Sequence, residues 1–226
     1  MRLTTAKLCL LLLLPVAVLL ICRLLGLYSR FVLDHDFVFG LVPLFDTDLE
    51  GNVPSWYSSS LLLAASGMAL LCRHADGDRR RRAYWGGLTA IFLYMSLDEA
   101  ARLHEQIGNL TALLSGRAGM LLFPWVLPFG ILALVVGALY LRFLFRLPVH
   151  TAATFVAAGA LYVGGALGME IVQALYVGSG GLSQSLTGQL VSTAEEFMEM
   201  GGASLFIYGA HGYLRQTGAA IRLSFA

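Results

Sequence analysis

Long apolar runs separated by short polar segments are the feature that most limits what this chain can fold into. The first run, residues 8–27, has about 20 residues, which matches the roughly 30 Å of hydrocarbon in a bilayer. Hydrophobic residues make up 58% of the 226 residues and charged residues only 13%, whereas a soluble domain carries about 25% charged residues. The pattern predicts an all-α fold, a polytopic membrane helix bundle that forms a single transmembrane domain over residues 1–226.

The charges between the apolar runs predict an orientation. Basic residues gather at alternate ends of the runs, most densely in RHADGDRRRR, which ends at Arg82. Because an excess of arginine and lysine marks cytoplasmic loops, both termini are expected in the cytoplasm and the long connection 31–55 on the outer side. About six spans are expected, at residues 8–27, 56–72, 84–107, 120–141, 151–177 and 186–213.

A cluster of ionisable residues ends the third run, in the sequence SLDEAARLHEQIGN. It contains Asp98, Glu99, Arg102, His104 and Glu105 within eight residues. Ionisable side chains are costly in hydrocarbon, so they usually face the interior of a bundle and carry function. At about 100° per residue, one straight helix cannot direct His104 and Asp98 to the same point. Either His104 has a second partner, or the helix is distorted there.

Further acids occur in the last two runs, at Glu170, Glu195, Glu196 and Glu199. With about 1.5 Å of rise per residue, these acids and those of the third run all fall in the outer half of the bundle. Arg102 is the one basic side chain expected at that height. Several carboxylates in a medium of low dielectric constant must be protonated, hydrated or bound to a cation. The sequence therefore predicts a metal site, or a hydrated path for protons or cations.

The residue types fit a divalent or transition metal ion, whose identity stays open. Carboxylates with one imidazole suit iron, manganese or zinc, and carboxylates alone suit calcium or magnesium. The paired Glu-x-x-His motifs of di-iron bundles are absent, because Ala101 stands three residues before His104. The expected metal ligands are Asp98, Glu99, Glu105, Glu170, Glu195 and Glu199, and His104 and Glu196 are the expected catalytic residues, with His104 a ligand or a base.

Three segments together carry a resemblance to a known group. They are E-x-N-x-P-x-W at Glu50, Asn52, Pro54 and Trp56, then SLDEAARLHE at 96–105 and EEFMEMGGASLF at 195–206. In this order the chain resembles a group of bacterial multi-pass inner-membrane proteins of unknown function. The resemblance implies a bacterial inner membrane, a periplasmic position for the loop 31–55, and a link between Glu50, Asn52 and the helix acids. It implies no reaction.

Three hypotheses for the function follow. The first is a metal-dependent membrane enzyme, a hydrolase or an oxidoreductase, which acts on a lipid or another membrane-soluble substrate, with Arg102, Glu50 and Asn52 binding the substrate. The second is a proton- or cation-coupled transporter that uses the same acids. The third is a non-catalytic subunit with membrane-protein partners, which exposed and unpaired acids would favour. A purely structural role also stays open, in which the acids pair with Arg102, cap helices or lie in interfacial water. The lipid bilayer is an expected partner in each case, and nucleic acid is not, because no basic patch interleaved with aromatic residues occurs.

Overall fold

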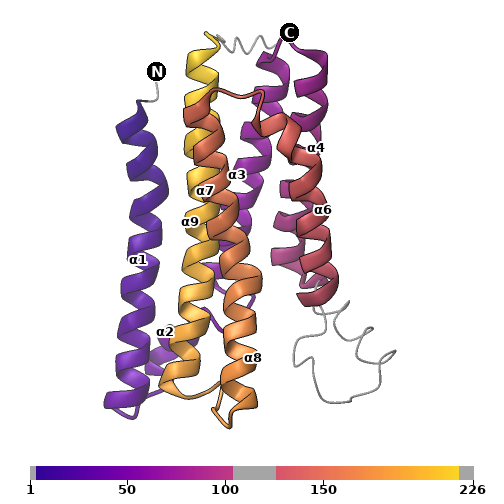
Figure 1. The fold of residues 1–226 in the computed structure, drawn as a ribbon. Helices are drawn as coiled ribbons and strands as arrows, with labels where there is room; N and C mark the ends of the chain where they lie inside the picture. The colour runs from indigo at the N-terminus through magenta and orange to yellow at the C-terminus, as the bar shows by residue number, and fades with distance from the viewer. Residues whose placement is uncertain (1–3, 104–125, 219–226) are drawn as a thin grey trace.

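The structure is a computed structural model that describes residues 4–103 and 126–218, and within these residues it is helical and contains no β-strand. Its longer helices run alternately up and down, as Figure 1 shows. The start of α1 and the end of α9 lie at the same end of the bundle. The long helices are α1 (Thr5–Val32), α3 (Val53–Ala75), α4 (Arg79–Ala101), α6 (Val126–Leu144), α7 (Val149–Val163), α8 (Glu170–Gly178) and α9 (Leu186–Gln216).

Local capping explains where several helices begin. The side chain of Asn52 accepts a hydrogen bond from the Ser55 amide (3.2 Å) at the start of α3. Asp78 does the same for the Arg80 amide (2.8 Å) at the start of α4, and Ser185 for the Gly188 amide (3.2 Å) at the start of α9. These short polar side chains satisfy amide groups that have no partner within the first turn of a helix.

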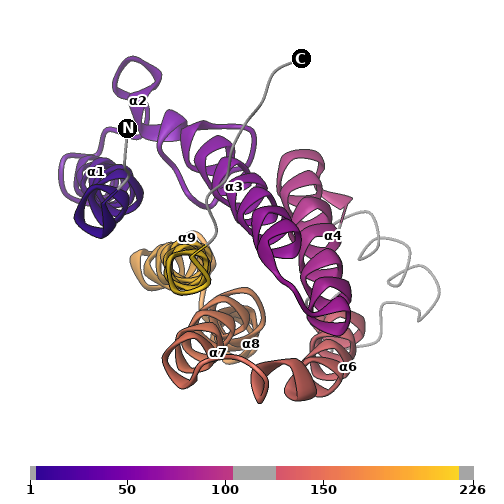
Figure 2. The ribbon, with the colours of Figure 1, turned by 90° about the horizontal axis from the view of Figure 1, so that it is seen from above.

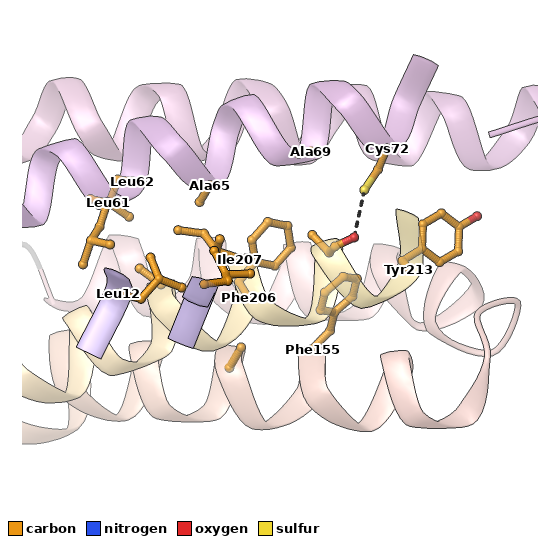
Figure 3. Close-up of a cluster of buried hydrophobic side chains, with 14 of the residues drawn as sticks. Leu12, Leu61, Leu62, Ala65, Ala69, Cys72, Phe155, Phe206, Ile207 and Tyr213 are labelled. Atoms are coloured by element: carbon orange, nitrogen blue, oxygen red, sulfur yellow. Dashed lines mark hydrogen bonds between the residues drawn. The ribbon is translucent and has the colours of Figure 1, made fainter. Parts of the chain in front are cut away.

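Helix α9 is the central element of the bundle. It packs against α1, α3 and α7, which surround it in the view along the bundle in Figure 2. Its contact with α3 uses small residues, since Ala65, Ala69 and Cys72 of α3 are fully buried. In Figure 3 the Cys72 thiol points at α9, where it donates a hydrogen bond to the Ala210 carbonyl at 3.6 Å. Phe155 of α7 and Phe206 of α9 stack beside this contact, with ring centroids 4.8 Å apart.

Glycines bring α7 and α9 into close contact. A Cβ atom added at Gly202 would lie 2.8 Å from the Ala158 carbonyl oxygen, and one at Gly165 would lie 2.8 Å from the Glu195 carbonyl oxygen. Such distances are below van der Waals contact, so only glycine fits. Small residues at helix interfaces allow this approach, as is common in membranes. These two glycines, Gly202 of α9 and Gly165 of the segment 164–169 that follows α7, thus hold α9 and its acids close against this part of the chain.

Helix α6 is attached mainly through its C-terminal half. The Tyr140 hydroxyl donates to the Tyr84 carbonyl oxygen (3.0 Å), and Phe143, which is 1% exposed, packs edge-on against Trp85 with ring centroids 5.0 Å apart. Towards its N-terminus α6 presents exposed leucines and valines. One end of α6 is therefore fastened to α4 by aromatic packing, and the other end leaves space between the helices.

Four segments are long and apolar enough to cross a membrane, and they indicate a membrane protein: Thr5–Val32, Val53–Ala75, Val126–Leu144 and Val149–Gly178. They overlap the expected spans 8–27, 56–72, 120–141 and 151–177. The expected spans 84–107 and 186–213 correspond to α4 and α9, whose described residues do not meet the same criterion of length and hydropathy. These two helices carry Asp98, Glu99, Glu195, Glu196 and Glu199.

Two segments differ from the regular helices expected. Helix α4 ends at Ala101, because Arg102 adopts a left-handed conformation (φ 55°, ψ 44°), so the helix expected over 84–107 is interrupted at Arg102, and the two alternatives for His104 stay predictions. Between α7 and α8 the chain forms a π-helical segment, η2 (Gly164–Met169). Such segments are uncommon in proteins overall, and those that occur are often found at functional sites.

The connection 31–55 is also more ordered than a simple loop. It contains the 3-10 helix η1 (Val38–Gly40) and the short helix α2 (Leu41–Leu44). After them the chain folds back against the bundle, so that Asp46 and Thr47 are buried, at 5% and 6% exposure. This acidic stretch is therefore part of the packed bundle at Asp46 and Thr47.

At the arginine-rich end of the bundle, Asp76 joins α3, α4 and α9. Its carboxylate accepts hydrogen bonds from Arg81 Nε (2.9 Å), Trp85 Nε1 (3.1 Å) and the Tyr213 hydroxyl (2.7 Å). Burial opposes ionisation of Asp76, but the hydrogen bonds from Arg81, the Asp78 amide, Tyr213 and Trp85 outweigh it and lower the pKa to about 2. Asp76 is thus an ionised anchor for three helices.

Candidate carboxylate-lined cavity

Three glutamates of α9 provide one wall of the candidate site. Glu195 and Glu199 are four residues apart and share a face of the helix, and Glu196 lies one position round from Glu195. All three are half-buried and line the same cavity. The close packing of Gly165 against the backbone at Glu195 holds this part of α9 against η2.

The end of α4 provides the opposite wall. Asp98 and Glu99 occupy its last turn and line the cavity. The left-handed Arg102 then turns the chain, and its guanidinium forms an ion pair with Glu50 from the α1–α3 connection. This pair is partly exposed, with 44% of the Arg102 side chain and 25% of the Glu50 side chain accessible. It therefore ties the end of α4 to the connection at the rim of the cavity.

Helix α7 and its continuation provide the third wall, with Tyr162 and Glu170. Tyr162 and Glu199 line the cavity together at the α7–α9 interface. Glu170 follows η2 directly, at the start of α8. The π-helical segment thus lies between the closely packed part of this helix and the residue that contributes a carboxylate.

These walls enclose one cavity of about 960 Å³. One end is lined by eight carboxylate residues, Asp48, Glu50, Asp98, Glu99, Glu170, Glu195, Glu196 and Glu199. The rest is apolar, with aliphatic and aromatic side chains from α4, α6, α7 and α9 that extend as far as Phe143 and Phe206. Along α6 the lining runs from Phe129 to Leu144, roughly 22 Å of helix. The cavity therefore joins an acidic head to a long apolar body.

The acidic end brings together carboxylic side chains from α4, α8 and α9 and from the α1–α3 connection. Among the lining residues that the structure describes there is no lysine, arginine or histidine. Thr47 also lines this end, and its buried hydroxyl has no hydrogen-bond partner among the described residues. Carboxylic side chains gathered from several elements and a buried unpaired hydroxyl both favour a bound ligand or cation at this end.

The described carboxylates do not form a ready-made metal centre. Within residues 4–103 and 126–218, no three His, Cys, Asp or Glu side chains are close enough to hold one metal ion together. His104 and Glu105, predicted as a catalytic residue and a metal ligand, lie outside the described residues. A metal ion bound by the described acids would require their side chains to move towards each other.

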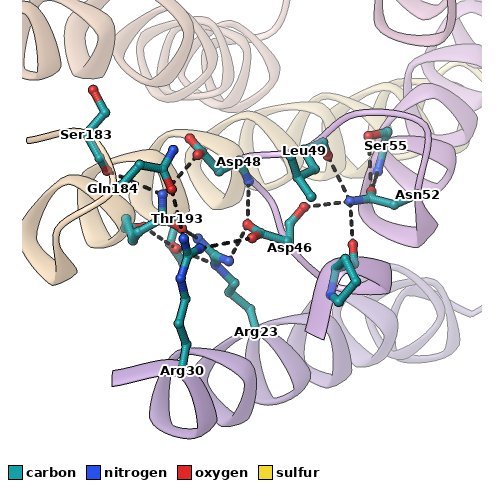
Figure 4. A network of polar contacts seen from close by, with 12 residues as sticks. Arg23, Arg30, Asp46, Asp48, Leu49, Asn52, Ser55, Ser183, Gln184 and Thr193 are labelled. Atoms are coloured by element: carbon teal, nitrogen blue, oxygen red, sulfur yellow. Dashed lines mark hydrogen bonds and ion pairs between the residues drawn. The ribbon is translucent and has the colours of Figure 1, made fainter. Parts of the chain in front are cut away.

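A second polar network supports the acidic end from outside, and Figure 4 shows it. Arg23 of α1, buried in the bundle, pairs with Asp46 and donates to Gln189 Oε1 (2.8 Å) and Thr193 Oγ1 (3.0 Å) of α9. Gln189 in turn donates to Asp48 Oδ2 (2.9 Å). The network joins α1, the connection and α9, and it thereby positions Asp48 and Thr47 at the cavity.

Most residues predicted for the site do converge. Glu50, Asp98, Glu99, Glu170, Glu195, Glu196 and Glu199 all line the cavity, and Arg102 lies at its rim. Asn52 has a structural role, because its amide donates to the carbonyl oxygens of Asp46 (2.5 Å) and Leu49 (2.8 Å) while its oxygen caps α3. Its assignment to substrate binding stays a prediction, as do the roles of the acids.

Sequence reasoning missed Arg23, Asp46, Thr47 and Tyr162. Arg23 had a signal of its own, an ionisable residue within an apolar run, which usually has a buried partner. The partner, Asp46, lies 23 residues further along the chain, and no local pattern connects the two. Thr47 and Tyr162 have ordinary neighbours in the sequence, so only the fold identifies them.

Comparison with known proteins gives a family without an activity. Residues 8–212 match the family model described as "Domain of unknown function (DUF8692)". No curated protein and no solved structure matches the chain.

Proposed function

The chain belongs to the DUF8692 family, and we propose that it is a membrane enzyme that acts on a lipid or another membrane-soluble substrate in the carboxylate-lined cavity. In this proposal a divalent or transition metal ion binds among the carboxylates at the acidic end. The apolar part of the substrate lies against α6 and α7. The observation that carries the proposal is that one cavity of about 960 Å³ joins eight carboxylate residues to a long apolar lining.

The size and lining of the cavity support a bound molecule with an apolar body. Ligand pockets are commonly of about 300–1,000 Å³ and mostly apolar, with a few polar groups that fix orientation. Here the polar groups lie at one end, so an amphiphilic substrate would enter with a single orientation. Its reacting group would then lie beside Glu195, Glu196 and Glu199.

The proposed roles of the described residues follow from position. Asp98, Glu99, Glu170, Glu195 and Glu199 come from three walls of one cavity and are the proposed metal ligands, and Glu196 is proposed for proton transfer. Glu105 as a ligand and His104 in proton transfer are proposed from the sequence pattern alone. Arg102 and Glu50, paired at the rim, are proposed to contact the polar part of the substrate, with Asn52 holding the connection beside them.

A proton- or cation-coupled transporter is the second candidate, and one observation favours it. The described acids line one end of the cavity without forming a group that could hold a metal ion. Protons can neutralise carboxylates one at a time and need no coordination geometry. The apolar walls between the acids and Phe143 oppose a polar path through the bundle, however, so the enzyme remains the first proposal.

The proposed setting is the inner membrane of a bacterium, with six spans and both termini in the cytoplasm. The alternation of the helices and the common end of α1 and α9 support it (Figure 1). The clustering of Arg79, Arg80, Arg81 and Arg82 at that same end supports the cytoplasmic assignment.

The test is metal content, measured by mass spectrometry on full-length protein purified in detergent without chelators. Wild type is compared with Glu195→Gln and Glu99→Gln, which alter opposite walls of the cavity. Asp36→Asn is the matched control, because Asp36 is an exposed acid of the connection. The proposal expects a stoichiometric metal in wild type and Asp36→Asn, and its loss in both cavity variants.

Two results would change the proposal. Absence of metal from wild type, even after incubation with manganese, iron and zinc, would remove the metal-dependent enzyme and favour proton-coupled transport. Equal metal in all four proteins would mean that the metal binds outside the cavity.

A further inference from the structure

A second cavity lies at the opposite end of the bundle from the carboxylates, among the ends of α1, α7 and α9. Its volume is about 370 Å³. Three basic residues, His150, His211 and Arg215, line it, and no acidic residue is among its described lining. Thr5, Thr151 and Tyr208 add hydroxyl groups. We refer to it as the basic pocket; its composition is the reverse of that of the carboxylate-lined cavity.

The start of α7 gives the basic pocket unused backbone donors. Pro148 precedes the helix and provides no side-chain cap. The first backbone hydrogen bond of the helix runs from the Ala152 amide to the Pro148 carbonyl oxygen (2.9 Å). The amides of His150 and Thr151 come before it in the chain and belong to the first turn of the helix. The first amides of a helix have no partner within the helix and attract anions.

Thr151, the third residue of α7, adds a hydroxyl group to the backbone donors of the helix end. It lines the basic pocket, and its residue is 2% exposed. No hydrogen bond to its hydroxyl is found within the described part of the chain. Its hydroxyl is therefore a further hydrogen-bonding group for a ligand bound in the pocket.

Arg215 lies on the wall opposite α7. Its Nη1 atom donates to the Thr5 hydroxyl at 2.7 Å, which holds the guanidinium across the gap between α9 and α1. Arg215 and His211, both of α9, line the pocket together. Arginine presents several donors in a planar fork that suits phosphate oxygens.

We propose that the basic pocket binds the phosphate group of a phosphomonoester. The donors come from three helices, as a tetrahedral anion with several oxygens requires. The phosphate can belong to a lipid head group, since the pocket lies where apolar spans end, or to a soluble molecule. This proposal does not depend on the function of the carboxylate-lined cavity.

Native mass spectrometry of the full-length protein in detergent tests the lipid source, with phosphatidic acid titrated against phosphatidylcholine as the phosphodiester control. Equilibrium dialysis with radiolabelled inorganic phosphate tests the soluble source. The variants are Arg215→Gln, which removes the charge, and Thr151→Val, which removes the hydroxyl and keeps the shape. Arg146→Gln is the matched control, because Arg146 is an exposed arginine outside the basic pocket.

Saturable binding of phosphatidic acid alone supports a lipid head group, and binding of both probes supports a phosphate from either source. In both cases Arg215→Gln weakens binding about tenfold or more, Thr151→Val weakens it roughly threefold or more, and Arg146→Gln leaves it unchanged. The proposal is overturned if neither probe binds wild type, or if the two pocket variants bind as the Arg146→Gln control does.

Discussion

Arg23 on α1 and Asp46 in the connection that follows it form an ion pair in which both side chains are almost fully buried, with exposed fractions of 2% and 7%. Arg23 also reaches Gln189 and Thr193 on α9. The pair thus joins the first helix, the connection and the central helix at one point. Asp46 Oδ1 also accepts a hydrogen bond from the Asp48 amide (3.0 Å). The ion pair thereby helps to position Asp48 at the acidic end of the cavity.

Removal of Arg23 should therefore destabilise the bundle strongly. Arg23→Leu leaves Asp46 buried without its main partner, and breaking a buried pair in this way costs about 3–5 kcal/mol. Arg30→Gln is the control, because Arg30 is 31% exposed and lies 3.8 Å from Asp46, so its loss should cost about 1 kcal/mol or less. Thermal unfolding in detergent measures both. Similar losses in the two variants would contradict a dominant role for the buried pair.

The Asp76 anchor predicts a pH dependence of stability. Its pKa of about 2 in the folded protein lies below the usual value of 3.8. The folded state therefore binds the proton less readily than the unfolded state, and the stabilisation is complete above about pH 4 and is lost as the pH falls towards 2. A shift of this size corresponds to on the order of 2 kcal/mol.

Unfolding measured from pH 6 to pH 2.5 in wild type and Asp76→Asn checks this prediction. Asp76→Asn should be less stable than wild type at pH 6, and the difference in unfolding free energy between the two proteins should decrease as the pH falls. Asp36→Asn, an exposed acid in the connection, should follow wild type throughout. A difference in unfolding free energy that does not change with pH would mean that Asp76 stabilises the fold through packing rather than through its charge.

The glycine contact between α7 and α9 predicts a steric effect. Gly202→Ala puts a Cβ atom 2.8 Å from the Ala158 carbonyl oxygen, and overpacking of this kind costs about 1–3 kcal/mol. Gly67→Ala on α3 is the control, because no atom lies within 4 Å of its added Cβ and alanine is the better helix former. Gly202→Ala should lower the unfolding temperature while Gly67→Ala holds or raises it. The same unfolding temperature in both variants would mean that α7 and α9 can move apart without loss of stability.

The apolar body of the carboxylate-lined cavity predicts a difference between two neighbouring valines of α6. Val136 lines the cavity, whereas Val135 is 50% exposed and faces outward. Val136→Trp should fill the cavity and reduce the lipid that copurifies with the protein, and Val135→Trp should not. Quantitative mass spectrometry of extracted lipids, per mole of protein, measures this. An equal lipid content in both variants would place the bound lipid outside the cavity.

The outline of the fold could be predicted because apolar runs and arginine-rich turns are local in the sequence. The meeting of the acids could also be predicted, since alternating helices with known rise place Asp98, Glu170 and Glu195 at similar heights. The end of α4 at Ala101 could not be predicted from the sequence. The stretch after Asp98 is rich in good helix formers, but Arg102 turns out of the helix and pairs with Glu50, a residue about fifty positions earlier in the chain.

The π-helical segment η2 sets the rotational phase between α7 and α8. A residue added within one turn rotates everything after it by about 100° relative to a regular helix. Deleting one residue from Gly164–Met169 would therefore keep Gly202 packed against α7 but turn Glu170 away from the carboxylates. Substitutions in α7 are therefore limited by its packing against α9, whereas substitutions in α8 are limited by what the cavity binds. The π-helical segment η2 sets the rotation between these two helices.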